Sequence, residues 1–193
     1  AISFTANWLR VEGAASYTLQ VEAITGEECP ATVLSENFSG FVSARSDASI
    51  SNSIVDRYTQ TPGWEVYGLY GMGDVSVRVS SSTVPGYMMT PVIENKEGTL
   101  TVEFDAAYYE TYASSVVVSV LNGSQTVATE TIPLTNSRAT YSCTFEDVPT
   151  GCRVKFASTS KRKRFYLYNI NIMDMSGVGS IVSTYDGLTT TAY

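Results

Sequence analysis

Leu100-Thr-Val-Glu-Phe-Asp-Ala106 alternates between apolar and polar side chains, and this stretch decides the fold. Such alternation predicts a β-strand with one buried face, because successive side chains on a strand point to opposite sides of the sheet. Further along, the apolar run from Val116 to Leu121 ends at Asn122-Gly123, a dipeptide typical of tight hairpin turns. Val127 to Leu134 is expected to pair with that run. The sequence therefore predicts antiparallel strands joined by short turns.

The same pattern extends over residues 32–174, up to a last strand from Phe165 to Met173. Turn signals separate about eight strands in this block, a spacing that predicts an all-β sandwich or barrel. Ser43 to Asp56 is polar and rich in serine, so we expect a long surface loop there. Outside the block, residues 3–8, Tyr17 to Ala23 and Ser180 to Thr184 are also expected to form strands.

Composition excludes several classes of function. The chain has 193 residues, is 44% hydrophobic, and carries a formal net charge of −7 with a pI near 4.6. The acidity argues against a nucleic-acid-binding protein, which needs a basic surface. No apolar run of about 18 residues predicts a membrane span. The N-terminal residues do not have the pattern of a signal peptide, and we expect that an export signal has been removed.

Histidine is absent and there are three cysteines, Cys29, Cys143 and Cys152. Without a histidine, the usual general base of serine and cysteine hydrolases is missing, and a structural zinc site is not expected. Cys143 and Cys152 flank a predicted turn. They either form a disulfide across a hairpin or are small buried residues.

The central block resembles the cleaved-adhesin jelly-roll domains of gingipains and related bacterial surface proteins. The residues that carry the resemblance are Glu36-Asn-Phe-Ser-Gly-Phe41, Pro62-Gly-Trp64, Tyr87-Met-Met-Thr-Pro91, Leu100-Thr-Val-Glu-Phe-Asp105 and Phe165-Tyr-Leu-Tyr-Asn-Ile-Asn-Ile172. The resemblance implies a jelly-roll β-sandwich in a secreted or surface protein. It also implies a structural Ca²⁺ held by Glu36, Asn37 and Asn169, although relatives often carry aspartate at the position of Asn169. The alternative is that Glu36 is a solvated strand residue and that Asn169 hydrogen-bonds to backbone.

Both ends of the chain resemble a fibronectin type III domain. Ser3-Phe-Thr-Ala-Asn-Trp8 and Val11-Glu-Gly-Ala-Ala-Ser-Tyr17-Thr-Leu-Gln-Val21 are similar to its strands B and C, and Tyr185 to Tyr193 is similar to the approach to its strand E. The resemblance implies a jelly roll over 32–175 that is inserted between fibronectin-like strands at 1–31 and 176–193. The two terminal segments should then pair in a small sheet.

Two groups of aromatic residues are candidates for ligand binding, because sugars stack on exposed rings and tyrosine is common at recognition surfaces. The first group lies in the loop-rich stretch from Gly63 to Gly73 and the second follows the strand at 100–106; together they comprise Trp64, Tyr67, Tyr70, Tyr108, Tyr109 and Tyr112. The alternative is that several of these rings fill the core, above all Trp64.

Charged residues offer two further possibilities. Lys161-Arg-Lys-Arg164 stands out in an acidic chain, either as a contact for anionic glycans or another domain, or as a solvated loop tip. Glu103 with Asp105, and Glu94 with Glu97, are close in sequence, but nothing places two carboxylates across a cleft as glycoside hydrolysis requires.

These observations predict a non-catalytic binding or adhesion module of a secreted or surface bacterial protein. Glycans, host or extracellular proteins and neighbouring domains of the parent chain are the partners we expect, and nucleic acid is not. The alternatives are a purely architectural spacer and, less favoured, a domain that acts on glycosides.

Overall fold

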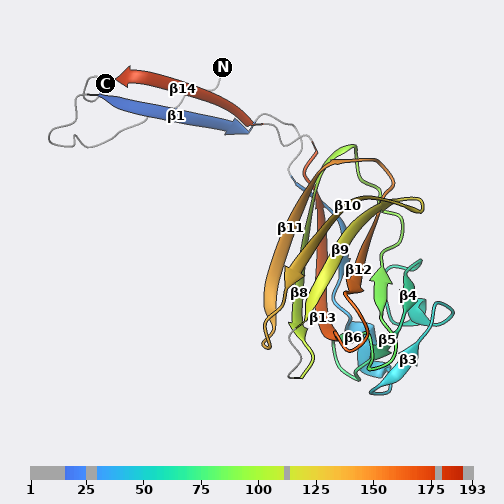
Figure 1. Cartoon of the computed structure of the whole chain (residues 1–193). Coiled ribbons are helices and arrows are strands. Elements are labelled where there is room, and N and C mark those ends of the chain that lie inside the picture. Colours follow the sequence, from blue (N-terminus) through green and yellow to red (C-terminus); the bar gives the residue numbers. More distant parts are fainter. Residues whose placement is uncertain (1–15, 25–29, 111–113, 177–179, 189–193) are drawn as a thin grey trace. The chain divides into compact units, whose positions relative to one another are not determined.

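The computed structural model describes residues 16–24, 30–110, 114–176 and 180–188. The chain divides into two compact units, one formed by Ala1–Cys29 with Gly177–Tyr193 and the other by Pro30–Ser176. In the first unit, β1 (Tyr17–Ile24) pairs antiparallel with β14 (Ser180–Leu188) (Figure 1). The expected pairing of the two terminal segments is therefore present. The strand expected at residues 3–8 lies outside the described residues, and the fibronectin type III assignment stays a prediction.

The second unit consists of two antiparallel sheets (Figure 1). The five-stranded sheet has the order β10-β9-β12-β7-β4, with bounds Gln125–Pro133, Ser115–Asn122, Arg153–Ser158, Tyr87–Met89 and Glu65–Tyr67. The seven-stranded sheet has the order β11-β8-β13-β6-β5-β3, with bounds Ala139–Val148, Gly98–Tyr108, Phe165–Asp174, Val77–Val79, Leu69–Gly71 and Ala48–Ile50. Its remaining strand, β2 (Ala31–Glu36), also pairs with β13.

One hydrophobic core lies between the sheets, and alternating residues supply it. Leu100, Val102 and Phe104 of β8 are fully buried, as are Val118 and Val120 of β9 on the opposite sheet. The residues between them in sequence are more exposed, as period-two alternation requires. The predicted hairpin at Asn122-Gly123 joins β9 to β10. The prediction of an all-β sandwich is thus confirmed in the described residues.

The prediction of a long surface loop over Ser43–Asp56 is wrong. This segment contains β3, which pairs with β5 at the edge of the seven-stranded sheet, and it runs into the 3-10 helix η2 (Val55–Arg57). Ile50 and Val55 are buried and hold the segment against the core. Two isolated apolar side chains among serines were too weak a pattern to predict this. With short strands of this kind, the described part of the chain between residues 31 and 174 has twelve strands, against the about eight predicted.

The described part of the chain has no helix long and apolar enough to cross a membrane. Its helical segments are η2 and the 3-10 helix η1 (Ser39–Ser43). The two described cysteines, Cys143 and Cys152, are unpaired and buried, so they are small core residues here and not a disulfide. Burial raises the pKa of Cys143 to about 12 and that of Cys152 to about 11, so both thiols are protonated and unreactive.

Candidate functional site

Two tyrosines lie side by side on the outer face of the five-stranded sheet. Tyr67 of β4 is opposite Tyr87 of β7, and their ring centroids are 6.2 Å apart. Their neighbours in sequence, Val66 and Met88, point into the core. Alternation therefore turns both tyrosines outward. Tyr67 is 56% exposed, which is unusual for an aromatic side chain on a sheet.

The register of the strands continues this pair into two rows that cross the whole sheet. The first row runs through Tyr67, Tyr87, Ala157, Val117 and Thr131. The second row runs through Glu65, Met89, Lys155, Ser119 and Thr129. With strands about 4.8 Å apart, four spacings give each row a length of about 19 Å. The face thus has an aromatic end on β4 and β7 and a hydroxyl-bearing end on β9 and β10.

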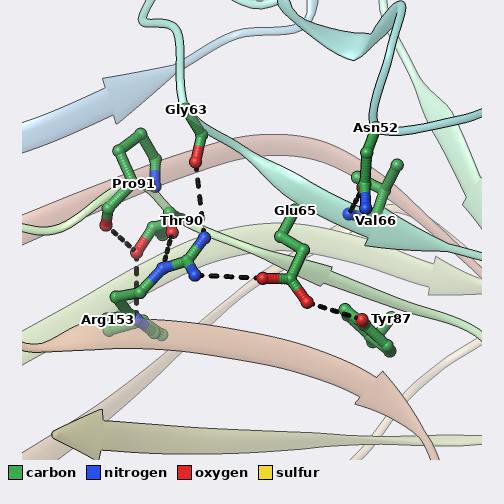
Figure 2. Close-up of polar contacts among 9 residues, drawn as sticks. Asn52, Gly63, Glu65, Val66, Tyr87, Thr90, Pro91 and Arg153 are labelled. Atoms are coloured by element: carbon green, nitrogen blue, oxygen red, sulfur yellow. Dashed lines mark hydrogen bonds and ion pairs between the residues drawn. The ribbon is translucent and has the colours of Figure 1, made fainter. Parts of the chain in front are cut away.

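Glu65 links the tyrosine pair to a half-buried arginine, as Figure 2 shows. The Tyr87 hydroxyl donates to Glu65 Oε1 at 2.8 Å, and Arg153 donates to Glu65 Oε2 at 3.1 Å. The hydrogen bond from Tyr87, followed by the contact with Arg153, lowers the pKa of Glu65. Burial and the hydrogen bond to this carboxylate raise the pKa of Tyr87. At neutral pH the carboxylate is therefore ionised and the phenol is held as a donor.

Arg153 replaces backbone hydrogen bonds where β7 ends (Figure 2). Pro91 has no N–H group and so donates no ladder hydrogen bond; backbone pairing resumes at Ile93 N, which donates to the Cys152 carbonyl at 2.8 Å. Arg153 Nε donates to the Thr90 carbonyl at 2.6 Å, and another guanidinium nitrogen donates to the Gly63 carbonyl at 3.3 Å. The Thr90 hydroxyl accepts from Val154 N at 2.9 Å and donates to the Pro91 carbonyl at 2.8 Å. One side chain of β12 thus holds both β7 and the segment that leads into β4.

The edge of β4 is also fixed, so the position of Tyr67 is well defined. Asn52 Oδ1 accepts the Val66 N–H at 2.6 Å, which occupies a backbone donor on this edge strand (Figure 2). Gly86 precedes Tyr87 in a tight crossing of backbones. A Cβ atom there would overlap the backbone nitrogen of Ser80 and lie 2.6 Å from the Gly68 carbonyl oxygen. Only glycine fits this position.

Lys155 occupies the middle of the second row. Its ammonium nitrogen lies 4.3 Å from the centroid of the Tyr87 ring, within the range of a cation–π contact. It forms no salt bridge with any described residue. Its neighbour in register is Ser119, whose hydroxyl lies 2.9 Å from that of Thr129. The face therefore presents a cation and two hydroxyl groups beside the aromatic pair.

The aromatic residues singled out from the sequence do not form one surface. Trp64 is 4% exposed and belongs to the core, so it fills the core as the alternative interpretation expected. Tyr108 packs against the core from β8. Tyr112 lies outside the described residues. Of the six, Tyr67 is the residue that the structure places on the five-stranded face.

Tyr70 and Tyr109 belong to a separate cluster on the outer face of the seven-stranded sheet. The Arg78 guanidinium lies 4.4 Å from the Tyr70 centroid and 5.1 Å from that of Tyr109, and Arg164 lies 4.1 Å from the Tyr109 centroid. Arg78 is 7% exposed and forms a salt bridge with Asp47. These rings are already stacked on guanidinium groups, which leaves them less of their surface for a ligand than Tyr67 has.

The residues expected to hold calcium are not brought together as a set. Glu36 is fully buried, and its two carboxylate oxygens accept the backbone N–H groups of Phe38 at 2.8 Å and Gln60 at 2.7 Å. Burial, the dominant cause, raises the pKa of Glu36. Asn37 Oδ1 accepts from Ser39 N at 3.0 Å.

Asn169 lies on the other side of the sheet from Glu36. Glu36 is opposite Ile170 on β13, and both are buried. Asn169 precedes Ile170 and therefore points outward, next to Asp105 of β8. Among the described residues there is no cluster of three or more acidic, cysteine or histidine side chains suited to a metal ion. Calcium binding stays a prediction.

The carboxylates weighed as a catalytic pair have other roles. Asp105 accepts hydrogen bonds from Arg138 at 2.6 Å and from the Thr140 hydroxyl at 2.7 Å. Although burial opposes it, these contacts lower the pKa of Asp105. Glu103 lies two residues away on the same outer face of β8. Asp105 is thus a structural link between β8 and β11.

Sequence reasoning missed Glu65, Tyr87, Lys155 and Arg153 as site residues. Each lies on a short strand whose partner is distant in the chain, so only the register of β4, β7 and β12 brings them together. Alternation around Tyr87 and around Val154 and Phe156 could have indicated outward-facing side chains. It could not have indicated which strands are neighbours.

Comparisons with known proteins support the fold. No protein-family model matches the chain, and no curated protein is significantly similar to it. Among solved structures, the unliganded CBM1 module of BiXyn10A matches with a TM-score of 0.50 and 12% identity, over 73% of this chain and 96% of that one. The K3 cleaved adhesin domain of Lys-gingipain from Porphyromonas gingivalis matches with a TM-score of 0.47 and 15% identity, over 76% of this chain and 99% of that one.

The second N-terminal cellulose-binding domain of Cellulomonas fimi β-1,4-glucanase C has a TM-score of 0.46 and 15% identity, over 78% of this chain and 98% of that one. At these identities the likeness concerns the fold alone. The chain has a jelly-roll β-sandwich fold, as predicted from its sequence.

Proposed function

We propose that this chain is a non-catalytic carbohydrate-binding module whose ligand lies along the outer face of the five-stranded sheet. The exposed Tyr67 ring beside Tyr87 is the observation that carries the proposal. An aromatic ring offers an apolar surface for the C–H face of a sugar, and ring hydroxyls nearby satisfy the sugar's polar edge. The two rows of the face give a polysaccharide a path of about 19 Å across the strands.

The polar groups of the face favour binding over catalysis. Glu65 is the one carboxylate in the two rows of described residues, and it is engaged by Tyr87 and Arg153. Glycoside hydrolysis by either common route needs two carboxyl groups about 5–10 Å apart. The lowered pKa of Glu65 also makes it a poor proton donor at neutral pH. We therefore infer a module that holds a glycan without cleaving it.

The fold neighbours are compatible with this role. The BiXyn10A structure is of a carbohydrate-binding module, and the Cellulomonas fimi structure is of a cellulose-binding domain. Polysaccharides of this kind lie outside the cell, so we place the chain in a secreted or surface protein.

Affinity electrophoresis tests the proposal. The protein is run in native gels that contain xylan, mixed-linkage β-glucan, galactan or polygalacturonate. We expect retardation in at least one gel and its loss in Tyr67→Ala. Tyr168→Ala is the matched control, because Tyr168 lies on β13 of the other sheet. Retardation that survives Tyr67→Ala and disappears in Tyr168→Ala would move the site to the seven-stranded sheet. No retardation by any polysaccharide would favour an architectural spacer.

A further inference from the structure

Positive charge collects along the proposed binding face although the chain carries a net charge of −7. Within the two rows the charged residues are Glu65 and Lys155, and Glu65 is paired with Arg153. Lys155 is in no salt bridge among the described residues, and its ammonium group lies over the Tyr87 ring. A group that binds next to the tyrosine pair therefore meets a cation that no salt bridge among the described residues engages.

A small cavity continues the face where β9 begins and β10 ends. Its volume is about 200 Å³, and its lining comprises Ser114, Ser115, Pro133, Leu134, Thr159 and Lys163. Ser115 and Pro133 are paired in register, two residues from Val117 and Thr131 of the first row, so they lie on the same side of the sheet. Three hydroxyl groups and an ammonium group are suited to an anionic substituent and would gain little from an apolar one.

The loop that follows β12 adds further cations at this end of the sheet. Ser158 N at the end of β12 donates to the Gly86 carbonyl at 2.9 Å, and Arg162 N donates to the Ser81 carbonyl at 2.8 Å, so the loop is tied to the segment that precedes β7. Lys161, Arg162 and Lys163 are all exposed. The basic run that stood out in the sequence thus begins at Lys161, four residues after Ala157, the β12 residue of the first row.

We propose that the ligand of this face is an acidic polysaccharide, one that carries carboxylate groups along its chain. The inference rests on the proposed carbohydrate-binding function and names its substrate class. Lys155 lies on one side of the first row and the Lys163 cavity on the other, so carboxylates on both sides of a chain that follows the row would meet cations. The acidic remainder of the protein repels such a polymer only weakly, because charges beyond about 8–10 Å are screened at physiological ionic strength.

The test compares polysaccharides that share a backbone and differ in charge. Isothermal titration calorimetry is done with polygalacturonate and its methyl ester, carboxymethylcellulose and hydroxyethylcellulose, and glucuronoxylan and arabinoxylan. We expect the acidic member to bind about threefold to tenfold more tightly, since each exposed ion pair contributes modestly. This preference should shrink in 0.5 M salt, as screening requires (Debye length about 10 Å at 0.1 M and about 3 Å at 1 M).

Variants separate the cations of this face from general charge effects. Lys155→Met with Lys163→Met should abolish the preference, so that the acidic and the neutral member bind with the same affinity. Lys96→Met, which removes a lysine near the other end of β12, should leave the preference intact.

Equal or tighter binding of the neutral member, or a preference unaffected by the double variant, would overturn the inference. Carbohydrate binding that depends on Tyr67 would still stand in that case. Failure of every polysaccharide to bind would overturn the proposed function and the inference together.

Discussion

Replacing Arg153 with methionine is the most informative test of how the binding face is held. Methionine keeps the apolar length of the side chain and removes every donor. The hydrogen bond from the charged guanidinium to the carbonyl of buried Thr90 is worth about 1.5–3 kcal/mol. The ion pair with the partly exposed Glu65 adds about 0.2–1 kcal/mol, and water replaces the exposed contact with Gly63. We expect a loss of about 2–4 kcal/mol in unfolding free energy.

Urea denaturation followed by tryptophan fluorescence measures this loss. The sequence has two tryptophans, Trp8 and Trp64, and Trp64 is buried in the sandwich. A Trp8→Phe background makes Trp64 the sole reporter for this unit. With an m-value of about 2 kcal/mol/M, the midpoint should fall by about 1–2 M. Lys155→Met is the control, because it removes a cation from the same face without breaking a hydrogen bond between described residues. Equal losses in the two variants would refute the role given to Arg153.

Three further outcomes are expected. Trp64→Phe should retain carbohydrate binding and change stability by less than about 1 kcal/mol, because the indole N–H has no hydrogen-bond partner among the described residues. Urea denaturation followed by circular dichroism measures this change, since the variant removes the fluorescent reporter; loss of binding would return Trp64 to the site. Asp174 accepts the backbone N–H groups of Lys96 and Ser176 at 2.7 and 2.8 Å, and its pKa is lowered from 3.8 by contacts that outweigh burial. The stability that Asp174 contributes is therefore full above pH 3.8 and is lost as pH falls through the folded pKa. Asp174→Asn should lose about 1–3 kcal/mol of unfolding free energy at pH 7, and its melting temperature should fall less steeply at acid pH than that of the unaltered protein. An equally steep fall at acid pH would contradict this. Gly86→Ala should cost about 1–3 kcal/mol through overpacking against backbone, which lowers the melting temperature in calorimetry by about 2–12 °C. An unaltered melting temperature would mean that this crossing relaxes easily.

The sequence predicted the long strands well because their patterns are local. Val102 and Phe104 alternate with Glu103, and Asn122-Gly123 marks a hairpin, so neither depends on distant parts of the chain. The short strands β3 to β6 were missed since three residues carry almost no periodicity. The segment around Ile50 becomes a strand only because the edge of β5 is there to pair with it.

The candidate site was harder to predict for the same reason. Tyr67 was identified from its type and surroundings, but Trp64, three residues earlier, turned out to be buried. Which face a residue takes on a short strand depends on the register of its neighbours, and local composition does not report that register. Tyr87 and Lys155 become part of one surface through pairings that span more than sixty residues of sequence, from β7 to β12.

An NMR titration tests most directly whether the five-stranded face holds the ligand. Uniformly ¹⁵N-labelled protein is titrated with hexasaccharides cut from whichever polysaccharide retards it. We expect the largest amide shift changes across β4, β7 and β12, centred on Tyr67, Tyr87 and Lys155. Changes confined to β5, β6 and β13, around Tyr70 and Tyr166, would contradict the account and place the ligand on the opposite side of the sandwich.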